Sequence, residues 1–138
     1  MYSFEESIYE SHPILRLLWD GESVLDEAGF IRGLGFGIKK AKMIINTMVQ
    51  IEIFFNSNGA KPPNDIKIYI NQGKYDIPCY CIKHNNFRRN DIIIERPYLQ
   101  IHNNNTSIGF GLVKAEGLIT LKDQIEDFIR RNDNRRYL

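Results

Sequence analysis

Three residues that can bind a metal ion, Cys79, Cys81 and His84, lie within six positions of one another. A structural zinc site needs four ligands, usually with paired cysteines two to four residues apart. The fourth ligand here would have to be His12, His102 or a carboxylate. Cysteines two apart on a strand are more often small core residues. We therefore expect no metal and no cofactor, and keep Cys79, Cys81 and His84 as the alternative metal site.

His84 and His102 are also the candidates for acid–base chemistry, because both are expected near strand ends and Lys83 lies beside the first. Two imidazoles and a cation can cleave a phosphodiester by general acid–base catalysis, provided that the geometry brings them together. Histidines at strand ends are usually ordinary surface residues. We expect no catalytic site, and keep a small RNase-like enzyme that uses His84, His102 and Lys83 as the alternative.

A glycine-rich segment, Gly33–Gly37, precedes Lys39 and Lys40. Backbone N–H groups at the start of a helix favour an anion, but no phosphate-loop motif is complete and we expect no apolar strand before the segment. Either the chain breaks here and a helix begins near Ile38, or one helix continues through the glycines. In the second case four small residues share one face that another backbone can approach closely: Gly29, Gly33, Gly37 and Ala41. We favour this packing face over an anion site.

Charge is distributed unevenly along the chain. Residues 1–27 carry seven acids and one base, a net charge of −6, whereas the remaining residues carry 17 bases and 10 acids. An acidic surface attracts a basic partner. We therefore predict that the partner-binding residues are Glu5, Glu6, Glu10, Asp20, Glu22, Asp26 and Glu27. The alternative is a solvated face that balances the protein's own basic part.

Arginines at 88–89 and 130–136, with Phe87 and Tyr137 nearby, resemble groups that hold nucleic acid. The sequence pI of about 7.8 lacks the basic excess of a dedicated nucleic-acid-binding protein. We therefore expect no nucleic-acid partner.

The elements that must position these residues are predicted from hydrophobic periodicity. Ser3 and Glu6 form a capping-box pattern that favours an N-terminal helix. The 3.6-residue period over Ile38–Phe55 predicts a long central helix, with a strand over 48–55 as the alternative. Alternating patterns then predict about four antiparallel strands, over 66–71, 77–82, 92–102 and 108–113. A C-terminal helix follows from Thr120, with a buried stripe formed by Leu121, Ile125, Phe128 and Ile129.

This order predicts an α+β fold in one domain over 1–138, helical in 1–60, with the sheet in 64–114 and the C-terminal helix in 120–132. A chain of 138 residues has the length of a single domain, and we expect no internal repeat. The two cysteines lie too close for a typical disulfide, and no run of about 18 apolar residues is present. We therefore expect a cytoplasmic protein that does not enter a membrane.

No motif in the chain names a reaction, which favours a non-enzymatic protein-binding module. Codons for its 21 Ile and 13 Asn are A/T-rich, which suggests a bacterial or mobile-element gene. Together with the acidic N-terminal part, this leads to the hypothesis of an immunity protein, a cytosolic cognate inhibitor that neutralises a bacterial toxin domain by occluding it. The partner would be a basic toxin domain, and self-association into a homo-oligomer is a further option.

Overall fold

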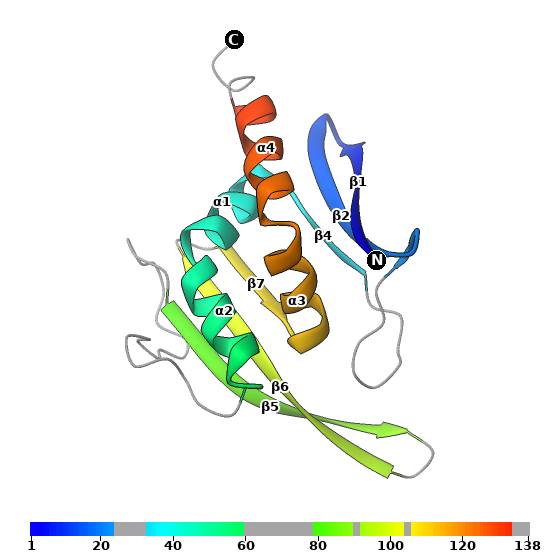
Figure 1. Ribbon diagram of the computed structural model, residues 1–138, viewed down its shortest axis with the longest axis vertical. Helices are drawn as coiled ribbons and strands as arrows, with labels where there is room; N and C mark the ends of the chain where they lie inside the picture. The colour runs from blue at the N-terminus through cyan, green and yellow to red at the C-terminus, as the bar shows by residue number, and fades with distance from the viewer. Residues whose placement is uncertain (24–32, 60–78, 90–91, 104–105, 134–138) are drawn as a thin grey trace.

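The computed structural model describes residues 1–23, 33–59, 79–89, 92–103 and 106–133 (Figure 1). It describes the backbone alone for 22–23, 79–89, 92–96, 103 and 133. The elements are β1 Tyr2–Tyr9, β2 His12–Trp19, β3 Glu22–Ser23, β4 Leu34–Phe36, α1 Ile38–Asn46, α2 Met48–Asn56, β5 Cys79–Arg89, β6 Ile92–Asn103, β7 Thr106–Phe110, α3 Leu112–Thr120 and α4 Lys122–Asp133. The predicted α+β class is confirmed.

The strands form two separate antiparallel sheets. In the first, β2 pairs with β1 along one edge and with β3 and β4 along the other. In the second, β6 lies between β5 and β7. No strand pair joins the two sheets within the described residues. The prediction of one sheet confined to 64–114 is therefore wrong, because strands also form before residue 60.

The N-terminal residues form a β-hairpin, so the helix predicted from Ser3 is wrong. Leu15 and Leu17 are buried, whereas Arg16 between them is exposed. This is the two-residue period of a strand with one buried face. Tyr2 and Phe4 of β1 repeat the alternation and pack against the core. The capping-box pattern is a local preference, and burial of these apolar side chains in a sheet outweighs it.

The central segment is helical, as predicted, and the alternative strand over 48–55 does not form. It consists of two helices instead of one, because the helix breaks at Thr47. The buried Thr47 side chain donates a hydrogen bond to the Met43 carbonyl oxygen at 2.8 Å. A hydroxyl that bonds back to the preceding turn bends a helix.

The glycine-rich segment contains strand β4, so the predicted helix face of small residues is wrong. Leu34 and Phe36 are buried and Gly35 between them is exposed, which again is a strand alternation. Gly33 precedes the strand, Gly37 is the N-cap of α1, and Gly29 lies outside the described residues. The structure therefore has the other arrangement considered above, with a helix that begins at Ile38.

The second sheet is longer than predicted. β6 continues through Pro97, as expected, but β5 reaches Arg89 across a predicted loop. The predicted strand over 108–113 ends at Phe110, and helix α3 follows it. The predicted strand over 66–71 lies outside the described residues.

The C-terminal helix is confirmed as α4, and Leu121, Ile125 and Phe128 of its predicted stripe are buried. Ile129 is half-buried against the same core. The predicted start at Thr120 is displaced by two residues. Thr120 ends α3, and its side chain donates to the Glu116 carbonyl oxygen at 2.7 Å instead of capping α4.

The expectation of no internal repeat is wrong, because the unit β4–α1–α2 occurs again as β7–α3–α4. Aligning residues 33–58 with 107–132 gives 11 identical residues in 26, including Gly-Phe-Gly at both strand ends. The two N-cap glycines have nearly the same backbone angles, φ −91° and ψ −168° at Gly37, and φ −91° and ψ −166° at Gly111. Both helical stretches also break after nine residues, at Thr47 and Leu121.

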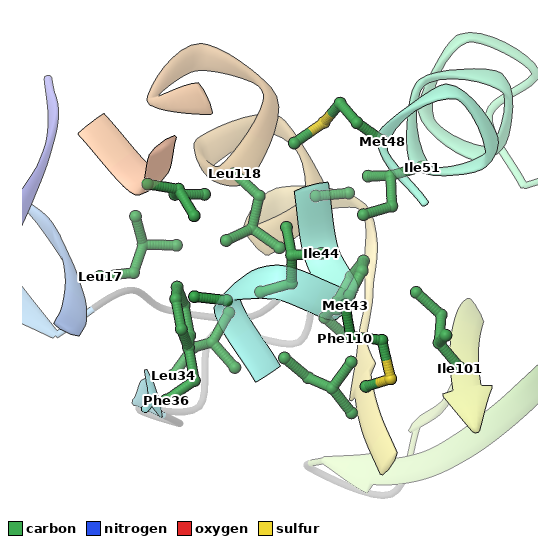
Figure 2. Close-up of a cluster of buried hydrophobic side chains, with 14 of the residues drawn as sticks. Leu17, Leu34, Phe36, Met43, Ile44, Met48, Ile51, Ile101, Phe110 and Leu118 are labelled. Carbon is green, nitrogen blue, oxygen red and sulfur yellow. The ribbon is translucent and has the colours of Figure 1, made fainter. Parts of the chain in front are cut away.

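The hydrophobic core repeats the same correspondence. Eight pairs of equivalent apolar positions are buried in both copies: Leu15 and Leu99, Leu17 and Ile101, Leu34 and Ile108, Phe36 and Phe110, Ala41 and Ala115, Ile44 and Leu118, Ile51 and Ile125, and Phe54 and Phe128. Figure 2 shows Ile44 and Leu118 at the centre, with Leu17 on one side and Ile101 on the other. The core is thus built from two similar halves.

We call residues 1–59 the first half and residues 79–133 the second half. The most extensive helix contacts join α1 to α4 and α2 to α3, which are contacts between halves. Helix α3 also packs on β1 and β2, and α1 contacts β7. In Figure 1 the helices therefore lie together, with the β1–β2 hairpin on one side and β5–β6 on another. The halves interlock instead of lying side by side as independent units.

Candidate functional site

Strand β1 forms one edge of the first sheet, and its far end is open to solvent. It pairs with β2 through eight consecutive residues without a bulge, and no other described strand pairs with it. At its start, Tyr2 donates a hydrogen bond to the Val113 carbonyl oxygen at 2.9 Å, and the Phe4 ring packs edge-on against Phe36. Beyond Phe4 the cover ends, so Ile8 and Tyr9 are 70% and 67% exposed.

The turn that closes this hairpin has an unfavourable sequence. Glu10 and Ser11 both have positive φ angles, 48° and 68°, as in a type I′ turn. Without glycine, left-handed backbone costs about 1 kcal/mol or more per residue. The next turn has the favoured sequence, Asp20 and Gly21, with φ of 50° and 84°. Strain is therefore concentrated at the exposed tip, which is where functional surfaces often carry it.

The register shows which backbone groups of β1 are free. In a two-residue hairpin the residues flanking the turn exchange both hydrogen bonds, so Tyr9 and its partner His12 point their backbone groups at each other. Alternation then turns the backbone N–H and C=O groups of Phe4, Glu6 and Ile8 away from β2. Met1 agrees with this pattern, because its carbonyl oxygen accepts from the Asp20 N–H at 3.0 Å. The outer edge of β1 can thus pair with another strand.

The predicted partner-binding acids lie in two places. Glu5, Glu6 and Glu10 belong to the β1–β2 hairpin. Asp20 lies at the opposite end of the strands, where it binds the N-terminal amino group of Met1 at 2.7 Å. Glu22 is in β3, with its side chain undescribed, while Asp26 and Glu27 lie outside the described residues. The acids therefore do not form one continuous patch.

One hairpin acid is already paired. Glu6 accepts hydrogen bonds from Arg131 at the end of α4, the shorter being 2.8 Å. Arg131 also donates to Asp127 at 2.7 Å. This bond, followed by the bond from Arg130, lowers the pKa of Asp127, and Glu6 followed by Asp127 raises the pKa of Arg131. Glu5 and Glu10 form no such pair with the described residues.

A groove of about 930 Å³ lies beside the hairpin tip. Its walls come from β1–β2, the start of α1 and the end of α4, and its lining includes Ile8, Ser11, His12, Pro13, Gly37, Ile38, Lys39 and Asn132. Asn132 is buried and donates to the Phe128 carbonyl oxygen at 2.9 Å. A smaller hollow of about 490 Å³ adjoins the groove at Gly37 and Lys39 and includes Thr106 and Ser107. The hairpin tip with the outer edge of β1 is the candidate functional surface, and the groove lies beside it.

The start of α1 gives this groove a positive wall. Gly37 supplies no side-chain cap, and the first turn carries Lys39 and Lys40 but no acid. Free N–H groups and lysines at a helix N-terminus attract negative charge. Strand β4 lies within the glycine-rich segment and leads directly into Gly37, and residues 24–32, where a preceding strand would have to lie, are outside the described residues.

The predicted catalytic and metal-binding residues lie in the second sheet. The register sets Cys79 opposite His102, Lys83 opposite Tyr98 and His84 opposite Pro97. The backbones of the two histidines are therefore five register positions apart, about 17 Å along the sheet. The side chains of Cys79, Cys81, Lys83 and His84 are not described, so the metal and catalytic alternatives stay predictions.

The prediction of an N-terminal helix missed Ile8 and Tyr9 as exposed residues at the edge of a sheet. The signal that could have found them is the alternation of Leu15, Arg16 and Leu17. It predicts strand β2, and a strand there implies a hairpin partner before it.

Comparison with protein-family models, curated proteins and solved structures finds no match to this chain. Among the helices that the structure describes, none is long and apolar enough to cross a membrane.

Proposed function

We propose that this protein is a non-enzymatic protein-binding module that takes an extended, basic segment of a partner along the free edge of β1. The observation that carries the proposal is that no described strand pairs with this edge, which ends in exposed Ile8 and Tyr9. Glu5 and Glu10, on either side of them, form no ion pair with a described residue. Backbone groups of the edge would supply affinity, and side chains would supply selectivity, as in other cases of strand addition.

Strand β1 lacks three of the common protections against strand pairing. Proteins commonly blunt exposed edges with lysine, proline or a bulge, but β1 contains neither residue and its register is continuous. Its charges are acidic, and hairpin residues 2–19 carry three acids and one base, a net charge of −2. This sign repels acidic strands and favours basic ones. The edge can therefore accept another strand, and its negative charge favours a basic one.

The narrower form of the proposal is a cognate inhibitor that occludes a basic toxin domain. It adds one requirement, that the segment bound by β1 belongs to the active surface of the partner. A basic toxin domain encoded beside this gene should then lose its activity on mixing with the protein. It should keep its activity on mixing with a Glu5→Lys/Glu10→Lys variant.

Selection from a displayed library of random peptides tests the broader proposal. Peptides of about twelve residues are long enough to cover a strand of this size. We expect selected sequences to alternate Lys or Arg with apolar residues. Their affinity should fall when salt rises from about 50 to about 300 mM, because surface charges are then screened.

Two variants and a control locate the binding surface. Ile8→Pro removes an outward N–H group without breaking the β1–β2 ladder, and Glu5→Lys/Glu10→Lys reverses the charge. Each should weaken peptide binding roughly tenfold or more, a loss of about 1.4 kcal/mol or more. The control Glu116→Lys changes an exposed acid on α3 and should leave affinity unchanged. Selection without a basic consensus, or binding that survives both hairpin variants, contradicts the proposal.

A further inference from the structure

The two halves meet through a surface with the composition of a protein–protein interface. Apolar side chains from both halves form its core, which includes the buried pair Ile44 and Leu118 (Figure 2). Its periphery carries polar contacts, namely the Tyr2 hydrogen bond to Val113 at 2.9 Å and the Glu6–Arg131 ion pair at 2.8 Å. An apolar centre with a polar rim is the usual anatomy of an interface between separate chains.

Close approach across this surface depends on a glycine. A Cβ atom at Gly117 of α3 would lie 2.8 Å from a methyl group of Leu17 and 3.0 Å from the Tyr2 ring. The equivalent position in α1 is Met43, which lies among Phe110 and Ile101 of the second half in Figure 2. Each first helix of a repeat thus packs against the sheet of the other half.

No hydrogen-bonded strand pair crosses from one half to the other among the described residues. Among the described residues, each sheet consists of strands from one half only, and the two halves are joined by residues 60–78 of the chain. Separation of the halves would therefore break side-chain packing but leave both ladders intact.

From the repeated fold and this crossing surface we infer that the partner of each half can be supplied by a second copy of the chain. In the exchanged dimer, the first half of each molecule packs on the second half of the other molecule, so the dimer contains two such units. Such a dimer makes the same contacts as two monomers, which is the condition for domain swapping. The covalent connection between the halves favours the monomer by mass action, so a high protein concentration favours exchange. The inference uses neither the edge of β1 nor the proposed function.

Complementation between two damaged chains tests this inference. Phe54→Asp damages the first half and Phe128→Asp the equivalent site of the second, since both side chains are fully buried. Each variant alone should lose its folded circular dichroism signal. The two variants, unfolded and refolded together, should regain up to half of the parent's signal. The recovered signal should increase with protein concentration, and the refolded species should have twice the monomer mass of 16.1 kDa.

A second pair of chains is the matched control. Phe54→Asp and Ile51→Asp both damage the first half, so no exchange between them produces an intact one. This mixture should recover no signal. Equal recovery in the control mixture, or no recovery in the test mixture, overturns the inference.

Milder variants keep the inference testable if the Asp variants aggregate. Phe54→Ala and Phe128→Ala remove the same rings without introducing charge, and each should melt below the parent. Refolded together at high concentration, they should show an added transition at the parent's Tm, from the exchanged units that carry neither substitution. A melting curve equal to the average of the two separate curves overturns the inference.

Discussion

At the scale of single residues, Gly59 is the position with the strongest steric constraint. It lies just after the end of α2, where its N–H donates a hydrogen bond to the Phe54 carbonyl oxygen at 2.9 Å. Its φ angle is +68°, and a Cβ atom there would overlap the ring of Pro97 in β6. Gly21 has a similarly positive φ, +84°, but no atom within 4 Å of an added Cβ. Both glycines have a left-handed backbone, but only Gly59 has no room for a Cβ atom. Comparing them therefore distinguishes the cost of backbone strain from the cost of steric overlap.

We therefore predict that Gly59→Ala is more destabilising than Gly21→Ala. Left-handed backbone costs a non-glycine residue about 1–2 kcal/mol, a penalty that both variants share. Overpacking against Pro97 should add about 1–3 kcal/mol at position 59 only. Urea unfolding followed by circular dichroism measures both. Equal losses would show that α2 does not pack closely on β6.

At the scale of elements, the β1–β2 hairpin joins a strained turn to an exposed edge. The Glu10 and Ser11 φ angles suit Asn-Gly much better than Glu-Ser. We therefore predict that Ser11→Gly stabilises the protein by about 0.5–1 kcal/mol, because it removes left-handed strain at the turn.

A serine-to-glycine substitution within strand β1 is the control. Ser7→Gly should destabilise by about 0.5–1 kcal/mol, since glycine in an extended strand loses more backbone entropy on folding. Chemical denaturation of both variants measures whether each substitution raises or lowers the free energy of unfolding. A loss of stability in Ser11→Gly would contradict the left-handed turn.

Local pattern predicted some elements correctly and misled at others. The spacing of Leu121, Ile125 and Phe128 identified α4 because that helix buries one stripe, and all three side chains are buried. At Ser3 and Glu6 the capping pattern favoured a helix, whereas the structure has a strand. Among the predicted acids whose side chains are described, only Glu5 and Glu10 form no ion pair with another described residue. Which acids are paired depends on Arg131, 125 residues from Glu6 in sequence.

At the scale of the molecule, interlocking of the halves implies that they unfold together. Trp19 is the single tryptophan, lies in the first half and stacks edge-on against Tyr2. Phe128 is fully buried in the second half. We predict that Phe128→Ala lowers stability by about 3–5 kcal/mol and lowers the Trp19 fluorescence midpoint as much as the circular dichroism midpoint.

Trp19 fluorescence and circular dichroism, followed in one urea titration, show whether the two halves unfold together. Coincident curves are the mark of a two-state transition. A Trp19 midpoint that stays at the parent value while circular dichroism shifts would show that the halves unfold independently. Phe54→Ala, the equivalent change in the first half, should behave in the same way.

By itself, the sequence determined the α+β class, the helical character of residues 38–56 and the C-terminal helix. These features follow from local periodicity and backbone preference. Tertiary structure alone decided the N-terminal hairpin, the pairing of α1 with α4 and of α2 with α3, and the open edge of β1. Each of these depends on which distant surface covers a segment. The Gly-Phe-Gly repeat was present in the sequence, but the equivalent strands and broken helices gave it a structural meaning.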